Sequence, residues 1–262
     1  MNCVLYEKHG RVGVITLNRP ERLNAINAPL LVDFEQVLSQ GIADDSIAVL
    51  VLTGAGRAFC SGHDLNDYHL QAKDEFAARA LIQAIQKITH TMMGCSKPVV
   101  GAIHGYAVGG GFEWLLNCDI VVASENLVAF FPEMEWGSFV TGGVSHLLPS
   151  TVGHHRAMEL FLLGERQSAS RLRELGLVNF VVPQEKLMAT ALEIANKIAA
   201  KSRSSIASLK QVINRDLGQA LWRAVELEQA ATVQAFLKPD SKERVKRFTD
   251  RQTKAPPPSG TT

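Results

Sequence analysis

The chain has 262 residues, of which 46% are hydrophobic and 20% are charged, and these fractions exclude a chain that is disordered throughout. Lys and Arg number 27 against 26 Asp and Glu, a formal net charge of +1. This balance argues against a nucleic-acid-binding protein, because phosphate contacts usually need a basic excess.

Short apolar runs alternate with helical patterns in the first half of the chain. Strands are predicted over residues 12–17, 48–53, 98–103 and 120–123, and helices over residues 29–40 and 76–93. The strand runs are apolar without interruption, as is typical of parallel strands that are buried on both faces. The fold class is therefore predicted to be α/β, as a single core over residues 1–195.

A helical region is predicted for residues 196–262. From about Leu187 onward the strand signals end, and helices are expected over residues 189–200, 204–212 and 218–237. Glu228 lies within a helical face of small and apolar residues, which favours a partly wet or subunit interface over a dry core. Residues 254–262 are rich in Pro, Gly and Ser, and we expect them to be disordered.

The cysteines and the apolar stretches indicate where the protein resides. Cys3, Cys60, Cys95 and Cys118 form no C-x-x-C pair, so neither a disulfide framework nor a metal site is expected. No apolar stretch reaches the length of a membrane span, and the first residues lack the apolar region of a signal peptide. We expect a cytoplasmic protein without a membrane partner.

A glycine-rich segment, HGYAVGGGFE over residues 104–113, follows a predicted strand. It is expected to be a loop that opens a helix, where bare N–H groups can bind an anion. The dinucleotide fingerprint fails because Trp114 stands where the third glycine is required, and no Gly-Lys-Ser/Thr follows for a phosphate loop. Tight packing of strand on helix explains three glycines equally well.

A second segment, RAFCSGHDL over residues 57–65, also follows a predicted strand. Ser61 invites interpretation as a nucleophile, but no G-x-S-x-G elbow surrounds it. His63 and Asp64 are adjacent, and such a pair seldom chelates a metal without further ligands.

Two carboxylates have apolar neighbours. Glu113 lies between Phe112 and Trp114, and Glu133 follows Phe131-Pro132. Apolar surroundings disfavour the charged form and raise the pKa of a carboxylate towards the range of a general acid or base. The alternatives are a first-turn glutamate that complements the helix dipole for Glu113 and a solvated loop residue for Glu133.

Together these segments resemble the crotonase family of enoyl-CoA hydratases, isomerases and relatives. The runs GYAVGGGFEWLLNCDIVVAS and AFCSGHDL are similar to its two signature regions, and VGVITLNRPERLNAI is similar to its first strand and CoA-contacting loop. LGLVNFVVP and SKERVKRFTDR resemble later landmarks of the family. The resemblance implies a spiral of ββα units followed by a helical C-terminal region, in a homotrimer or homohexamer.

The resemblance also implies a catalytic site and a substrate. Backbone N–H groups of Ser61 and Gly110 would bind the thioester oxygen of an acyl-CoA, and Glu113 and Glu133 would flank its α,β carbons. No cofactor is expected, because acyl-CoA is the substrate. The residues implied to contact CoA are Arg22, Asn24, Ala25, His63, Asp64, Leu65 and Arg251, the last often from a neighbouring subunit.

Two positions depart from the pattern of the family's hydratases. Thr141 stands where a glycine often helps to position the water, and Trp136 is bulkier than the usual aliphatic residue. A tryptophan there resembles the aromatic hydratase-lyases, which lack a glutamate at the position of Glu113. The expected activity is hydration of a 2-enoyl-CoA. The alternatives are an enoyl-CoA isomerase, an aromatic acyl-CoA hydratase-lyase and a catalytically silent CoA-binding protein.

Overall fold

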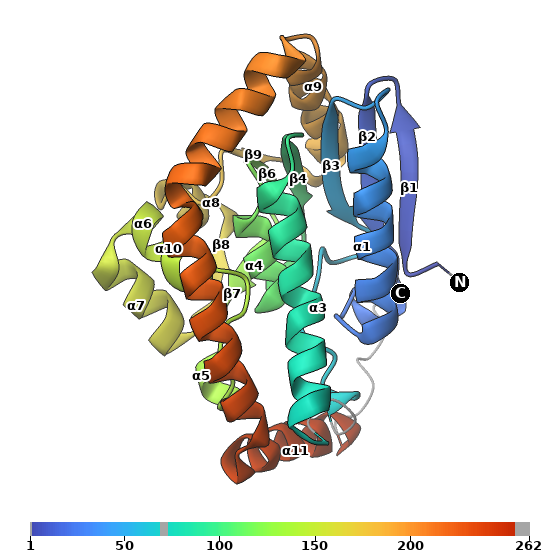
Figure 1. Ribbon diagram of the computed structural model, residues 1–262. Helices are drawn as coiled ribbons and strands as arrows, with labels where there is room; N and C mark the ends of the chain where they lie inside the picture. The colour runs from blue at the N-terminus through green and yellow to red at the C-terminus, as the bar shows by residue number, and fades with distance from the viewer. Residues whose placement is uncertain (1, 69–72, 255–262) are drawn as a thin grey trace, which may run out of the picture.

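The computed structural model describes residues 2–68 and 73–254 (Figure 1). A six-stranded sheet follows the order of the chain, and β1 is antiparallel to β2 while all later neighbours are parallel. Its strands are β1 (Val4–His9), β2 (Val12–Leu17), β3 (Val49–Gly54), β4 (Val99–Ile103), β6 (Ile120–Ser124) and β9 (Phe180–Val182). The order never reverses, so the sheet has no topological switch point of the Rossmann type.

A second sheet of three strands accompanies the first. It consists of β5 (Tyr106–Val108), β7 (Val128–Phe130) and β8 (Gln167–Ser168). Since β5 follows β4 and β7 follows β6, the chain passes from one sheet to the other in successive turns. This spiral arrangement and the helical region after it confirm the predicted α/β fold class.

Both faces of the larger sheet are covered. All six residues of β3 are buried, and its first four residues alternate between two apolar clusters. Leu50 and Leu52 belong to the cluster that contains residues of α1 (Ala28–Ala43) and α3 (Glu75–Gly94), whereas Val49 and Val51 pack on the opposite side. This two-sided burial explains why the strand reads as an uninterrupted apolar run.

Helix α9 (Leu187–Ala199) covers the second face. Leu187, Ala191, Ala195 and Ala199 recur every four residues, are buried, and belong to the same cluster as the outer side of β3. Small side chains on this stripe let the helix approach the sheet closely. The expected division at residue 195 falls inside α9 and remains a prediction.

The C-terminal region differs from the prediction in the number of its helices. One helix, α10 (Arg203–Leu237), replaces the two expected over residues 204–212 and 218–237, and α11 (Pro239–Lys254) follows it. Residues 213–217 contain neither glycine nor proline, so nothing in the backbone ends the helix there. Helix α10 lies along α3 (Figure 1). The tail predicted to be disordered lies, beyond Lys254, outside the described residues.

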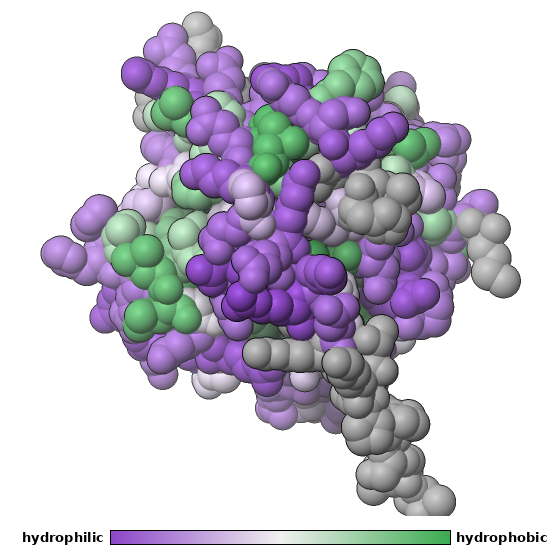
Figure 2. Space-filling view, turned by 90° about the horizontal axis from the view of Figure 1, so that it is seen from below, coloured by the Kyte–Doolittle hydropathy of each residue, from purple (hydrophilic) through white to green (hydrophobic). Residues whose placement is uncertain are grey.

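The remaining helices connect the strands or flank the second sheet. They are η1 (Pro20–Arg22), α4 (Gly110–Leu116), α5 (Glu133–Trp136), α6 (Val144–Val152), α7 (His154–Leu163), α8 (Ala169–Glu174) and η2 (Gln184–Lys186). Seen from the side of α11, the surface is mostly hydrophilic (Figure 2). No helix in the described part of the chain is both long enough and apolar enough to span a membrane.

Candidate functional site

The two glycine-containing segments lie side by side. Cys60 forms a parallel bridge with Ala107, because its N–H donates to Tyr106 O at 2.9 Å and its carbonyl accepts from Val108 N at 3.0 Å. Gly62 has a φ of +82°, and a Cβ there would lie 2.6 Å from Val108 O. Only glycine therefore permits this close approach of the two chains.

The glycine-rich segment opens a helix, as predicted. The turn after β5 contains Gly109, and α4 begins at Gly110. In the part of the chain that the structure describes, no protein acceptor is bonded to the N–H of Gly110. Gly110 also lines a pocket, so this helix start presents a backbone donor to it.

Ser61 does not offer its N–H to that pocket. The N–H donates to the carbonyl of Leu23 at 3.0 Å, so the prediction of a backbone donor at Ser61 is wrong. The residues on either side of His63 are both bonded to Ile26: Ile26 N donates to Gly62 O at 2.7 Å, and Asp64 N donates to Ile26 O at 2.9 Å. In such a parallel bridge the residue between the two bonds, His63, turns its own N–H away from Ile26.

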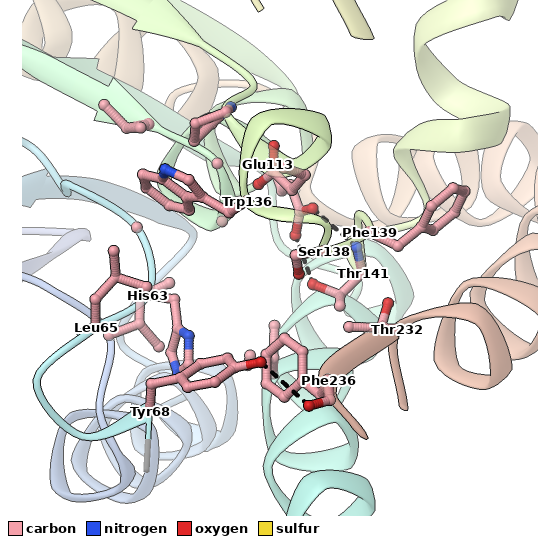
Figure 3. Close-up of a pocket in the computed structure, with 18 of the residues that line it drawn as sticks. His63, Leu65, Tyr68, Glu113, Trp136, Ser138, Phe139, Thr141, Thr232 and Phe236 are labelled. Carbon is pink, nitrogen blue, oxygen red and sulfur yellow. Dashed lines mark hydrogen bonds between the residues drawn. The ribbon is translucent and has the colours of Figure 1, made fainter. Parts of the chain in front are cut away.

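An apolar pocket lies between the glycine segments and the C-terminal helices (Figure 3). Tyr68, Phe236 and the half-buried His63 lie together on one side of the pocket. The rings of His63 and Phe236 are stacked with their centroids 5.5 Å apart, and the Tyr68 hydroxyl donates to Phe236 O at 3.1 Å. Further apolar lining residues are Ile26, Leu65, Ile82, Ile85, Val108, Trp136, Phe139 and Val245. The lining suits an apolar ligand that is held by few polar groups.

Glu113 extends from the first turn of α4 into this pocket and is 1% exposed. Oε1 accepts the N–H of Thr141 at 2.8 Å, and Oε2 accepts the Thr141 hydroxyl at 2.7 Å (Figure 3). Its carboxylate is thus tied to another segment of the chain, and the alternative of a glutamate that only complements its own helix is not supported.

Glu133 is the first residue of α5 and reaches the same pocket. It is 9% exposed, so the alternative of a solvated loop residue is excluded. Its Oε2 is buried and has no hydrogen-bond partner among the described residues. Its Oε1 lies where a Cβ on Gly109 would come within 2.4 Å, so the glycine leaves room for the carboxyl group.

Burial raises the pKa of both carboxyl groups above the ordinary value of a glutamate. For Glu113 the negative charge of Glu228 raises the pKa further, while the hydrogen bonds from Thr141 oppose the rise. For Glu133 the second cause of the raised pKa is the charge of Glu113. Two like charges in one buried pocket disfavour joint ionisation, so the pair tends to hold one proton between its members.

The raised pKa of Glu133 predicts a pH-dependent effect of Glu133→Gln on stability. The folded state retains this proton above the ordinary pKa of glutamate, about 4.3, so stability is lost as pH rises towards the folded pKa. Glutamine does not titrate, so the variant does not lose this stability. The lost free energy of unfolding is about 1.4 kcal/mol for each unit by which the pKa is raised. Each kcal/mol corresponds to roughly 2–4 °C in Tm. The Tm of Glu133→Gln minus that of wild type should therefore increase between about pH 5 and about pH 8.

Glu159→Gln provides the control for this measurement, since Glu159 is exposed on α7. Its Tm difference from wild type should be the same at every pH. A Glu133→Gln difference that is equally constant would contradict the burial of an ionisable group at this position.

The residues predicted to contact CoA divide into three groups. Arg22 is exposed, and His63 and Leu65 line the pocket. Three are buried and are not among the residues that line the pocket: Asn24, Ala25 and Asp64. The side chain of Arg251 lies outside the described part of the structure, so its predicted contact is untested.

Backbone contacts explain the buried group. Asn24 has a φ of +55°, its amide donates to Ala55 O and Ala58 O at 2.9 and 2.8 Å, and its oxygen accepts Arg19 N at 2.7 Å. Asp64 pairs with Arg19 at 3.1 Å. The side chains of Asn24 and Asp64 therefore hold the loop together, and the contact of these two residues with CoA stays a prediction.

Sequence reasoning missed the partners of Glu113. Thr141 was noted only as a departure from glycine, yet it bonds both carboxylate oxygens. Glu228, expected at a wet or subunit interface, is 1% exposed within this chain. Its apolar neighbours on α10 were the signal for burial, but nothing in the sequence identified the backbone groups that it meets.

The described residues include no cluster of three or more His, Cys, Asp or Glu side chains placed to hold a metal ion.

Comparisons with known proteins agree over nearly the whole chain. The family model described as enoyl-CoA hydratase/isomerase matches residues 7–255. A probable enoyl-CoA hydratase of Rhizobium meliloti is 35% identical over 94% of this chain and 94% of its own. A short-chain-enoyl-CoA hydratase of Clostridium acetobutylicum is 32% identical over 96% of each. The crystal structure of an enoyl-CoA hydratase/isomerase from Mycobacterium paratuberculosis has a TM-score of 0.89 at 31% identity, covering 94% of this chain and 98% of that one.

Proposed function

The chain belongs to the enoyl-CoA hydratase/isomerase, or crotonase, family, and we propose that it adds water to the α,β double bond of a 2-enoyl-CoA. The observation that carries this proposal is the pair of buried carboxyl groups, Glu113 and Glu133, in one apolar pocket beside the N–H of Gly110. Relatives that are named enoyl-CoA hydratases, at 32–35% identity, support the same activity.

Glu113 is the general base in this proposal. Both of its oxygens accept hydrogen bonds from Thr141, and such bonds favour the ionised form. An ionised carboxylate in an apolar pocket is able to take a proton from a water molecule.

Glu133 is the general acid. Its Oε2 has no hydrogen-bond partner among the described residues, and burial raises its pKa, so of the two groups it is the better site for the shared proton. Environments that separate the proton affinities of two carboxyl groups assign the acid and the base.

Backbone donors bind the thioester oxygen. Gly110 supplies one N–H, and His63 replaces Ser61 as the second, because the His63 N–H points away from Ile26 and His63 lines the same pocket as Gly110. Preorganised N–H groups stabilise the negative charge that develops on this oxygen. The imidazole of His63 instead stacks on Phe236.

The reaction balances with these groups. Glu113 removes a proton from water as the water oxygen forms a bond to the β-carbon, and the electron pair of the double bond moves towards the thioester oxygen. The resulting enolate takes the proton of Glu133 at its α-carbon, which yields a 3-hydroxyacyl-CoA. Proton exchange through solvent then returns Glu113 to its ionised form and Glu133 to its protonated form.

CoA binding is proposed along the mouth of the pocket. His63 and Leu65 line that pocket, and Arg22 on η1 is exposed. Arg22 lies near the pocket, because its carbonyl accepts the hydroxyl of Ser61, another lining residue, at 3.5 Å. Arg251 would add a positive charge for a phosphate group. A trimer or hexamer remains a prediction, and exposed apolar side chains on α7 and α10, among them Leu162, Leu163 and Leu209, are consistent with it.

Crotonyl-CoA and a 3-enoyl-CoA distinguish the proposed activity from its alternatives. We expect the protein to convert crotonyl-CoA to 3-hydroxybutyryl-CoA, identified by mass, and to convert the 3-enoyl-CoA more slowly. Faster conversion of the 3-enoyl-CoA to its 2-enoyl isomer would favour the isomerase. Trp136 lines the pocket, so a hydroxycinnamoyl-CoA tests the aromatic alternative. Binding of all three esters without turnover would identify a silent CoA-binding protein.

A further inference from the structure

A further buried carboxylate, Glu228 on α10, has no part in the proposed reaction. It is 1% exposed, and both of its oxygens bond to one backbone segment. Oε2 accepts the N–H of Gly143 at 2.7 Å, and Oε1 accepts the N–H of Ser145 at 2.8 Å. A buried carboxylate with two such bonds fixes the backbone that it meets.

Thr232, one helical turn further along α10, contacts the other end of the same segment. Its hydroxyl lies 3.1 Å from Val140 O and 2.7 Å from the carbonyl of Glu228. Two side chains of one helix therefore hold residues 140 and 143–145, and the part between them bridges from one contact to the other.

That middle part carries the contacts to Glu113. Thr141 donates both hydrogen bonds to the Glu113 carboxylate. Gly142 is packed so tightly that a Cβ there would lie 2.7 Å from Cβ of Glu113, and its carbonyl accepts the Asn117 amide at 3.0 Å. A shift of residues 140–145 would consequently move the donors of Glu113.

The charge of Glu228 also acts on Glu113. Among the described residues, the ionisable groups that influence Glu113 or respond to it are Glu133 on α5, Glu228 on α10 and Cys60 beside β5. Burial raises the pKa of Glu113 most, and the charge of Glu228 is the next cause. Burial raises the pKa of Glu228 itself, and the hydrogen bonds from Ser145 and Gly143, which favour its ionised form, oppose that rise in part.

We propose that Glu228 is a positioning residue, which holds residues 140–145 in place behind Glu113 and keeps a negative charge next to the base. The inference rests on the proposed hydration. Glu228 is not among the residues that line the pocket, so it acts through the loop and through its charge. Removing its charge and shortening its side chain should therefore have different effects on the reaction.

The test compares Glu228→Gln with Glu228→Asp in the full-length protein. Glutamine keeps the shape but loses the charge, and it can accept only one of the two N–H bonds. Aspartate keeps the charge but is too short to hold both donors in place. Glu226→Gln, an exposed change on the same helix, serves as the control, and thermal unfolding verifies that each variant is folded.

Crotonyl-CoA hydration is measured against pH for every variant. We expect Glu228→Gln and Glu228→Asp to lower kcat by roughly 10-fold or more with little change in KM, since small misplacements of a catalytic group have large costs. Only Glu228→Gln should also move the acidic limb of the pH profile to lower pH, by about half a unit or more, because the like charge behind Glu113 is gone. Glu226→Gln should match wild type.

Two results would overturn the proposal: a Glu228→Gln enzyme with the kcat and acidic limb of wild type, or an equal shift of the limb in Glu228→Asp. Infrared spectra of the free enzyme, recorded against pH, report the protonation of its carboxyl groups without turnover. Subtracting the spectra of the Glu113→Gln variant leaves the signal of Glu113. If wild type does not hydrate any enoyl-CoA, the proposed function fails. The infrared titration then still decides whether Glu228 acts on Glu113.

Discussion

Glu113→Gln and Glu133→Gln are each expected to lower the turnover of crotonyl-CoA by ~10²–10⁴-fold, the usual contribution of a positioned acid or base. Glutamine keeps the size of each side chain but cannot exchange a proton at neutral pH. In Glu113→Gln the bond from one Thr141 donor is also lost, because an amide nitrogen accepts no hydrogen bond.

Binding of the CoA ester should change far less than turnover. The proposed donors to the thioester oxygen are the backbone N–H groups of Gly110 and His63, which neither substitution removes. Isothermal titration with a saturated acyl-CoA, which cannot be hydrated, measures this binding. Glu135→Gln is the matched control, because Glu135 is exposed and two residues beyond Glu133 on α5.

The double mutant adds a test of coupling. When two residues act in one step, the effects of their substitutions on turnover are not additive. The double mutant should therefore be only slightly slower than the slower single mutant. If only Glu133→Gln abolishes activity and a 3-enoyl-CoA is the better substrate, the enzyme is an isomerase. If neither substitution slows any reaction, the catalytic assignment is wrong.

The parts of the fold that the sequence predicts well are those with long, uniform patterns. Strands β2, β3, β4 and β6 are apolar runs buried on both faces, so their positions follow from composition alone. The strands of the second sheet are only two or three residues long, too short for any period to emerge.

In the site, likewise, some features follow from the local sequence and others do not. Apolar neighbours correctly indicated that Glu113 and Glu133 are buried, because local composition reports burial. Hydrogen bonds between distant segments are invisible to such reasoning. The Ser61 N–H meets Leu23, and the carboxylate of Glu228 meets Gly143, only after the chain has folded.

Gly109→Ala should damage both the site and the fold. Gly109 has φ +51° and ψ −118°, a conformation that L-residues with a Cβ rarely adopt. The added Cβ would lie 2.4 Å from Oε1 of Glu133 and 3.5 Å from its Cδ. Because the backbone of Gly109 adjoins the helix start at Gly110, relief of this clash must displace either the acid or the Gly110 donor.

We therefore expect Gly109→Ala to lower crotonyl-CoA turnover by ~10²-fold or more, since a displacement of about 1 Å at a catalytic group has this effect. Backbone strain should add a loss of about 1–3 kcal/mol in the free energy of unfolding, measured by denaturant titration. Gly176→Ala is the control: Gly176 also has a positive φ, +77°, but a Cβ there meets nothing within 4 Å. It should lose stability through strain alone and keep full turnover. Equal turnover in the two variants would show that Gly109 does not constrain Glu133, and the geometry proposed for the acid would have to be abandoned.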